Sequence, residues 1–323
     1  MYIMRLLIGS HTEIFMQQVV PVVLASDNNQ VHAMATVMTS AVANANENTF
    51  YNFFCLLHEN VTPENKERLT SVANNGRCAV NLVSMDKYFN DEKLSYNHST
   101  GLAHTITTPT LYRLKIPSVL QQFDKIVYVD TDIVIRGDLT DLYNFPIQEN
   151  FIAGVPATWA NEKANRKKWM GRSKIPSMEY YVNCGVLLMN LKAMRECGLE
   201  EKFFDFIQQH GFYGLDGDQL VLNYTCHGRI AFLPCRYNVT ASNIKHSSAM
   251  KAYYPQKAID EAIGNPTIFH WTGADKPWKY YDVTLAHEWW QYYAKSPFGD
   301  LPLKRFSKND FFLKLKVFLK KLF

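Results

Sequence analysis

The sequence lacks several features that define common classes of protein. No apolar stretch approaches the roughly 18 residues that span a bilayer, and the six cysteines form no Cys-x-x-Cys pair. Neither a Gly-x-Gly-x-x-Gly fingerprint nor a P-loop is present. These absences argue against a membrane-spanning protein, a zinc site built on cysteine pairs, and a nucleotide site cradled by glycine amides.

The N-terminal residues and the cysteines indicate where the protein works. Residues 1–15 are too short and too interrupted for a signal peptide, so we expect a cytosolic protein. Most of the cysteines lie among apolar residues, which suits reduced, buried thiols better than disulfides or zinc ligands. They are Cys55, Cys78, Cys184, Cys197, Cys226 and Cys235.

The chain has no excess of basic residues outside its C-terminal segment. The net charge is +4, but residues 304–323 alone carry seven Lys and Arg against one Asp. The other residues hold 27 basic and 29 acidic side chains, a net charge of −2. Because this part also has no recognised nucleic-acid motif, we do not expect nucleic acid as a partner. An anionic membrane surface is the candidate partner of the basic tail.

Apolar and aromatic residues are abundant, at 47% and 14% of 323 residues, which is enough for a full core in one large domain. Strand-like and helix-like segments alternate along the first half. An apolar strand within 19–29 ends in a polar turn, and a helix is expected over 31–45. A strand over 49–57, a helix opened by Thr62 and Pro63, and a strand over 78–83 follow. The alternation predicts an α/β fold with a mostly parallel sheet and helices on both faces.

Residues 126–135, IVYVDTDIVI, place two carboxylates inside an apolar run. The run predicts a strand buried on both faces, in which Asp130 and Asp132 point the same way. Ligands of open α/β sheets bind at the carboxyl ends of strands, which gives this pair functional weight. The repulsion between the carboxylates must be neutralised by a basic side chain or by a divalent cation.

Further elements are expected on either side of this run. A helix over 111–116 should stop at Pro117, and an amphipathic helix should cover 192–210. A strand over 180–191 contains Asn183 and Gly185, and a glycine inside a strand suggests close approach by another group.

Five segments together resemble glycosyltransferase family 8 in order and spacing. They are ASDNN (25–29), YVDTD (128–132), VNCGVLLMNL (182–191), DGDQLVLN (216–223) and HWTGADKPW (270–278). The resemblance covers residues 18–280 and extends to bacterial lipopolysaccharide hexosyltransferases and, distantly, glycogenin. It implies a GT-A catalytic domain over 18–280, a C-terminal helical region over 281–323, a UDP-sugar donor, Mn²⁺ (with Mg²⁺ as the alternative) and retention of anomeric configuration.

The resemblance also implies a role for each matching position. The metal ligands it implies are Asp130, Asp132 and His270. The uracil and ribose contacts would be Ala25, Asp27 and Asn29, and the diphosphate contacts Gly273 and Lys276. The positions near the donor sugar would be Arg113, Asn183 and Gly185, and the catalytic positions Asp218, which binds sugar hydroxyls, and Gln219, under the anomeric carbon. From the residues alone, a helix-cap role for Asp27 is an equal alternative to nucleotide binding.

One position departs from the family pattern. Members often read Asp-Gln-Asp where this chain has Asp218, Gln219 and Leu220, so the second acid is missing or is supplied by Asp216. Gln219 is an amide and therefore a poor nucleophile. We favour front-face attack through an oxocarbenium-like ion pair, in which the departing phosphate accepts the proton of the acceptor.

These residues lead to one hypothesis and two alternatives. The hypothesis is a retaining transferase that moves a hexose from UDP-galactose or UDP-glucose to a saccharide acceptor, such as lipopolysaccharide or another cell-surface glycan. The first alternative is a sugar nucleotidyltransferase, although residues 25–31 lack the glycine-rich basic loop that such enzymes use. The second alternative is a non-catalytic UDP-sugar-binding protein.

The basic tail predicts peripheral attachment to the inner face of the plasma membrane. On a helix over 309–323, seven apolar residues fall on one arc and four lysines on the other side. The apolar residues are Phe311, Phe312, Leu315, Phe318, Leu319, Leu322 and Phe323; the lysines are Lys314, Lys316, Lys320 and Lys321. The alternative is a helix packed back on the catalytic domain. Each basic residue contributes roughly 1 kcal/mol near anionic lipid.

Truncation after Leu303 should therefore release the protein from anionic liposomes and lower its activity on a lipid-embedded acceptor. Hydrolysis of UDP-sugar in solution should stay near the wild-type rate, because the catalytic residues are retained. Liposome sedimentation at physiological salt measures the first effect. A truncated protein that still sediments, or that loses hydrolysis and stability together, would show that the tail is structural.

Overall fold

The computed structural model describes residues 17–89, 108–158, 175–210 and 217–308. Its strands are β1 (Gln18–Ser26), β2 (Thr49–Leu57), β3 (Cys78–Ser84), β4 (Lys125–Val129), β5 (Ile133–Ile135), β6 (Ile152–Pro156), β7 (Val182–Asn190), β8 (Ile230–Phe232), β9 (Val239–Thr240) and β10 (Ile268–His270).

The α-helices are α1 (Val31–Ala43), α2 (Pro63–Thr70), α3 (Thr108–Leu111), α4 (Ile116–Val119), α5 (Thr140–Tyr143), α8 (Leu191–Glu196), α9 (Leu199–His210), α10 (Asp218–Thr225), α11 (Ala241–Lys245), α12 (Gln256–Gly264) and α13 (Ala286–Tyr293). Short 3₁₀ helices are η1 (Ser71–Asn75), η2 (Asp86–Tyr88), η4 (Tyr112–Lys115), η5 (Cys235–Tyr237) and η6 (Ser247–Ala252).

Seven strands form the main sheet, in the order β3-β2-β1-β4-β7-β6-β8. The neighbours from β3 to β4 are parallel, and β6 is parallel to β8. Strand β7 runs antiparallel to both β4 and β6. The predicted α/β fold with a mostly parallel sheet is therefore confirmed, and its β1–α1 unit lies where the sequence pattern indicates.

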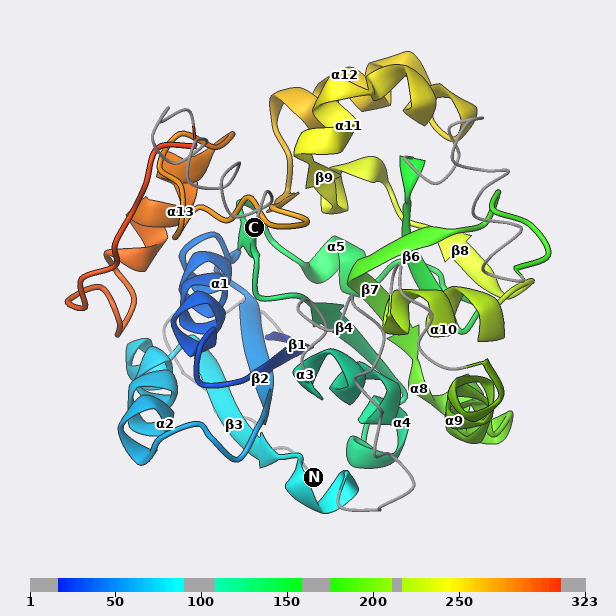
Figure 1. Cartoon of the computed structure of the whole chain (residues 1–323), viewed down its shortest axis with the longest axis horizontal. Helices are drawn as coiled ribbons and strands as arrows, with labels where there is room; N and C mark the ends of the chain where they lie inside the picture. Colours follow the sequence, from blue (N-terminus) through cyan, green and yellow to red (C-terminus); the bar gives the residue numbers. More distant parts are fainter. Residues whose placement is uncertain (1–16, 90–107, 159–174, 211–216, 309–323) are drawn as a thin grey trace, which may run out of the picture.

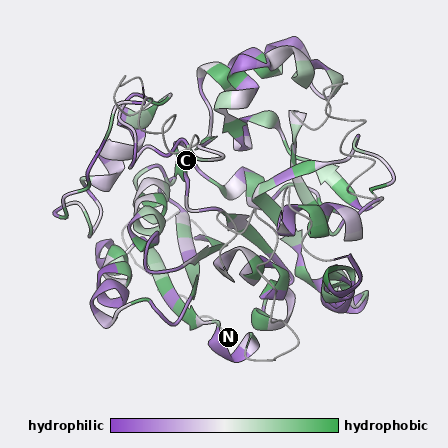
Figure 2. Cartoon of the chain, viewed as in Figure 1, coloured by the Kyte–Doolittle hydropathy of each residue, from purple (hydrophilic) through white to green (hydrophobic). Residues whose placement is uncertain are grey.

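Alternate residues of the strands enter two separate cores, one on each face of the sheet. In β4, Val127 and Val129 belong to the core beneath α1 and α13, whereas Ile126 and Tyr128 belong to the core shared with α8, α9 and α10. This period of two is the signature of strands covered on both faces. The helices surround the sheet in Figure 1, and Figure 2 shows the hydrophobic colouring gathered on the central strands.

The Asp-x-Asp run is not one strand, which corrects the prediction for residues 126–135. Strand β4 ends at Val129 and stays in the main sheet, whereas β5 begins at Ile133 and pairs with β10 in a second sheet of order β5-β10-β9. Asp130 and Asp132 lie in the irregular link between the two sheets. Carboxylates at a strand end can turn toward a ligand, which they could not do inside a ladder.

Two helix predictions also need correction. The segment before β4 does not stop at Pro117, because Pro117 occupies the first turn of α4, where its missing N–H costs no hydrogen bond. The helix predicted over 192–210 is two helices, α8 and α9, which are separated at Gly198 in the left-handed region with φ of 58°. All six cysteines are unpaired thiols, as predicted.

The C-terminal part of the described chain packs on the core beneath α1. Helix α13 lies beside α1, and Trp289 belongs to the core on that face. Beyond it, Phe306 exchanges backbone hydrogen bonds with Lys279 and Tyr281, at 2.8 and 3.2 Å. The boundary predicted at residue 280 stays a prediction. No helix among the described residues is long and apolar enough to cross a membrane.

These contacts change the truncation test, because a cut after Leu303 removes Phe306 and Ser307, whose hydroxyl donates to Asp282. A cut after Lys308 leaves them in place and removes only 309–323, the predicted interfacial helix, which lies outside the described residues. The cut after Lys308 is therefore the better test.

An imidazole is buried where α1 meets α13. The ring of His32 lies edge-on to Trp278, Trp289 and Tyr293, with centroids 5.7 to 6.3 Å apart. Its Nε2 is buried and has no hydrogen-bond partner among the described residues. Burial lowers the pKa of His32 from 6.5 to about 4, and a hydrogen bond from the imidazole to the Asn29 backbone only partly offsets this shift.

Acid should therefore loosen this helix pair. Between pH 6.5 and pH 4 the unfolded chain binds a proton at His32 that the folded chain excludes, so stability falls as pH falls. At pH 5 the loss is about 2 kcal/mol relative to pH 7. Urea unfolding of His32→Leu should lack this component, whereas the exposed control His287→Leu should keep it. Equal pH dependence in wild type and His32→Leu would contradict the prediction.

Candidate active site

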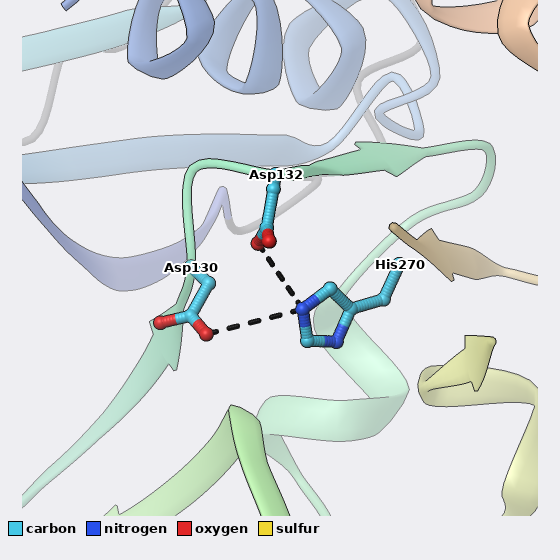
Figure 3. A group of neighbouring side chains, drawn as sticks. All are labelled: Asp130, Asp132 and His270. Atoms are coloured by element: carbon cyan, nitrogen blue, oxygen red, sulfur yellow. Dashed lines mark ion pairs between the residues drawn. The ribbon is translucent and has the colours of Figure 1, made fainter. Parts of the chain in front are cut away.

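Two carboxylates and an imidazole converge where β4 ends (Figure 3). His270 Nε2, at the end of β10, lies 3.1 Å from Asp132 Oδ1 and 3.9 Å from Asp130 Oδ2. One potential ligand atom from each residue falls within 4.8 Å of the others. His270 is buried, and the two carboxylates are partly buried. Residues more than 130 positions apart thus share one site, because β10 pairs with β5 immediately after the Asp-x-Asp link.

A glycine makes this convergence sterically possible. Gly185 lies in β7, and its backbone oxygen accepts from the Asp130 N–H at 2.8 Å. A Cβ atom at Gly185 would lie 2.2 Å from His270 Cε1 and 2.9 Å from Asp130 Oδ2. The close approach predicted for a glycine within this strand is confirmed, and the approaching groups are the imidazole and the carboxylate.

Each carboxylate of the pair has its own basic partner. Arg113 donates to Asp130 at 3.2 Å and also pairs with Asp218, and its guanidinium lies 4.7 Å over the ring of Tyr128. Lys276 pairs with Asp132 Oδ2 and donates to the Trp271 oxygen at 2.6 Å. Basic side chains, one of the two neutralising groups considered from the sequence, are therefore present.

This pairing shifts the pKa values of Asp132 and Arg113. Burial acts to raise the pKa of the Asp132 carboxyl, but Lys276 and His270 outweigh it and hold that pKa below its usual range. Burial acts to lower the pKa of Arg113, yet Asp130 and Asp218 outweigh it and raise that pKa well above its usual value. Asp132 is therefore ionised at neutral pH. Removal of one partner would leave a buried charge, at a cost of about 3–5 kcal/mol.

A polar cavity of about 370 Å³ opens beside these residues. Nine predicted site positions and Asn238 line it. The nine are Arg113, Asp130, Asp132, Asn183, Gly185, Asp218, Gln219, His270 and Gly273. The cavity therefore brings together the predicted metal ligands and all of the positions predicted near the donor sugar.

The positions predicted for the nucleotide lie elsewhere on the same edge. Ala25 is near the end of β1, parallel to β4, and Asp27 and Asn29 follow in the turn before α1. The Asp27 carboxylate accepts from the N–H groups of Asn29 and Gln30 at 3.0 and 3.2 Å. Asp27 therefore stabilises the turn before α1. It is not the helix cap considered from the sequence, because the N-cap residue of α1 is Gln30, which makes no side-chain cap hydrogen bond. Neither these three residues nor Lys276 line the cavity.

Side chains on α10 and β7 form the opposite wall. Asp218 is 2% exposed, at the start of α10, and its carboxylate pairs with Arg113. Gln219 Oε1 accepts from the Cys184 N–H at 2.8 Å, which fixes its amide against β7. Asp216, the candidate for a second acid, lies outside the described residues.

Sequence reasoning missed two residues at this site. Tyr128 donates its hydroxyl to Asp130 at 2.9 Å, although it lies in a quoted motif. Asn238, just before β9, contacts His270 Nδ1 at 3.0 Å and is buried. A single asparagine in LPCRYNVT carries no recognisable sequence signal, because its contacts are to residues far away along the chain.

Residues 21–282 match the profile of glycosyl transferase family 8. The chain belongs to this family of glycosyltransferases. General stress protein A of Bacillus subtilis is 22% identical over 266 residues, which cover 81% of this chain and 88% of that protein. Lipopolysaccharide 1,2-glucosyltransferase of Escherichia coli K12 is 28% identical over 52% of this chain and 51% of its own length. The recognised resemblance to family 8 is thereby confirmed.

Solved structures support the GT-A-type fold of this family 8 chain. The galactosyltransferase LgtC, solved with donor and acceptor sugar analogs, has a TM-score of 0.68 at 21% identity, covering 85% of this chain and 96% of that one. The apo bifunctional glycosyltransferase WbbM has a TM-score of 0.72 at 20% identity and covers 90% of this chain. This chain spans about half of WbbM, with 52% covered.

The side chains of the family 8 site fit a divalent cation. Two carboxylates and one imidazole form a mixed O/N donor set that suits an octahedral ion such as Mn²⁺. Lys276 forms an ion pair with Asp132 Oδ2. Asp132 Oδ1 is buried, receives no hydrogen bond from the described residues and lies 3.1 Å from His270 Nε2. A buried carboxylate oxygen whose polar neighbour is an imidazole nitrogen 3.1 Å away is an arrangement that a shared cation would stabilise.

If this site binds the Mn²⁺ and UDP that the resemblance implies, the substitution Gly185→Ala should abolish that binding. The added methyl group would displace His270 from the carboxylates, because no rotamer removes a Cβ atom from its backbone position. Isothermal titration with UDP and Mn²⁺ measures the effect. The control is Gly264→Ala, whose Cβ would meet no atom within 4 Å. If Gly185→Ala binds UDP like the control, the proposed metal site is wrong.

Proposed function

We propose that the protein is a retaining hexosyltransferase that moves galactose or glucose from a UDP-hexose to a saccharide acceptor. The observation that carries the proposal is the cluster of Asp130, Asp132 and His270 on the wall of a polar cavity, at the carboxyl end of a central parallel strand. Membership of family 8 supports sugar transfer, and the cluster supports a donor that carries a diphosphate.

The cation proposed here is Mn²⁺, with Mg²⁺ as the alternative, held by Asp130, Asp132 and His270. When bound, it would supply positive charge to the diphosphate of the donor. Lys276 would turn from Asp132 to a phosphate oxygen, and Gly273, with φ of 77° in an open loop, leaves room for that group. Ala25, Asp27 and Asn29 would face the uracil and ribose from the end of β1.

The hexose would occupy the cavity beside α10. Asp218, held by Arg113, would accept hydrogen bonds from sugar hydroxyls. Gln219 would lie under the anomeric carbon, where its carbonyl dipole stabilises positive charge while the Cys184 N–H holds it in place. Because an amide is a poor nucleophile, we propose front-face attack, in which the departing phosphate accepts the proton of the acceptor hydroxyl.

The acceptor class follows from relatives, one of which is named a lipopolysaccharide glucosyltransferase. We propose lipopolysaccharide or another cell-surface glycan as acceptor, carried on lipid at the inner face of the plasma membrane. The basic segment 304–323 would hold this cytoplasmic protein at the anionic surface.

Calorimetry with a panel of UDP-sugars, with and without Mn²⁺, tests this proposal and selects the donor. We expect UDP to bind only with the metal, and one UDP-hexose to be hydrolysed slowly without acceptor. Asp132→Asn should weaken metal-dependent UDP binding by at least about 100-fold, since a ligand charge is lost from the site. The exposed control Asp205→Asn should bind like wild type.

The alternatives give different outcomes. A nucleotidyltransferase would bind a nucleoside triphosphate in preference to UDP and would release pyrophosphate. A non-catalytic binding protein would bind a UDP-sugar but leave it intact with every acceptor. Tight UDP binding by Asp132→Asn in chelator-treated protein would contradict the metal-dependent mechanism.

A further inference from the structure

Three hydrogen bonds connect the strand glycine to the imidazole of the site. The Gly185 N–H donates to Asn183 Oδ1 at 3.0 Å. The same oxygen accepts from Asn238 Nδ2 at 2.7 Å. At the other end of that amide, Asn238 Oδ1 lies 3.0 Å from His270 Nδ1. The network spans β7, the residue before β9 and the end of β10, so it crosses between the two sheets.

The direction of each bond follows from the one unambiguous donor. A backbone N–H can only donate, so the Asn183 atom that faces Gly185 must be the amide oxygen. Its second partner must then be a donor, which identifies the Asn238 group facing Asn183 as the NH₂ group. The remaining Asn238 atom is an oxygen, and it faces His270. An amide oxygen only accepts, so His270 Nδ1 carries a proton.

This assignment leaves one nitrogen of His270 for a ligand. Nδ1 is occupied by its proton and by Asn238, whereas Nε2 faces Asp132 and Asp130 at 3.1 and 3.9 Å. We propose that Asn238 is a positioning residue that directs the Nε2 lone pair of His270 into the cation site. The proposal rests on the metal site of the proposed function. Histidine ligands of metals generally need such an acceptor on the other ring nitrogen.

Because both residues are buried, the Asn238 amide is the group that accepts the hydrogen bond from His270 Nδ1. Its side chain is 1% exposed and that of His270 3%, so water is poorly placed to substitute for the amide. The network also limits which group of Asn183 can contact the donor sugar. Asn183 Oδ1 already accepts two hydrogen bonds, so a contact from Asn183 to the donor sugar would use its NH₂ group, which would donate to a sugar oxygen.

The test is a double-mutant cycle on Mn²⁺ affinity, measured by calorimetry in the presence of UDP. Asn238→Leu should weaken Mn²⁺ binding about 10- to 100-fold. Asn238→Asp, whose carboxylate still accepts from Nδ1 but cannot donate to Asn183, should weaken it less than Asn238→Leu does. In a His270→Ala background, Asn238→Leu should change the affinity less than about twofold, because its effect passes through the imidazole. Asn48→Leu, the same substitution at an exposed position outside the cavity lining, is the control.

Each contrary outcome identifies what has failed. Additive effects of Asn238→Leu and His270→Ala, or wild-type affinity in Asn238→Leu, would overturn the positioning role. Absence of Mn²⁺ binding by the wild-type protein would instead overturn the metal site itself. Thermal unfolding of every variant separates loss of affinity from loss of fold.

A second measurement needs no Asn238 variant and no metal. In wild-type protein with ¹⁵N-labelled histidine, the His270 ring should carry a proton on Nδ1, and comparison with His270→Ala assigns its signals among the ten histidines. A ring protonated on Nε2 with a bare Nδ1 would overturn the inference even if Asn238→Leu failed to fold.

Discussion

The confinement of three carboxylates, Asp130, Asp132 and Asp218, in one poorly solvated site is the constraint around which this fold is arranged. Charges of one sign repel strongly where water is excluded, so each needs a fixed cationic partner. Arg113 joins Asp130 to Asp218, and Lys276 holds Asp132. These pairs tie η4, the start of α10 and the loop after β10 to the end of β4, where the cavity opens.

The same constraint explains why the central strand stops where it does. Inside a ladder, Asp130 and Asp132 would both be held on one face of the main sheet. Because the chain leaves that sheet at Asp130 and re-enters pairing at Ile133, both side chains meet His270 from β10. Gly185 supplies the space, since its neighbours approach closer than any side chain would allow. The second sheet therefore brings His270, the third residue of the cluster, to the two carboxylates.

Lys276 links the site in its present form to the proposed chemistry. Its ammonium occupies one oxygen of Asp132, while the other oxygen stays open toward the imidazole. A divalent ion at the open oxygen would compete with the ammonium for the same carboxylate charge. The lysine would then be free to meet the phosphate that accompanies the ion, so that one carboxylate serves both arrangements.

Much of the fold could be predicted from local pattern. The β1–α1 unit, the strands at 49–57 and 78–83, and the mostly parallel sheet follow from hydrophobic period and caps, which act over a few residues. Local pattern did not predict the break after Val129, because an apolar run looks the same in one strand as in two. It also did not predict the split at Gly198 or the place of Pro117 in α4. Similarly, nothing near residue 306 in the sequence indicates that it packs on the loop around 280.

For the site, the sequence by itself determined the chemistry, because it supplies paired acids after an apolar strand and a histidine in HWTGADKPW, which are residue types that bind cations. It also supplies the glycine that allows these side chains to approach closely. Tertiary structure alone decided which partners these residues have. Asp27 binds its own turn, Arg113 and Lys276 neutralise separate acids, and Asn238 orients His270. The reason is physical: residue type is fixed locally, whereas the direction of a hydrogen bond or the pairing of a charge depends on atoms that only the folded chain brings together.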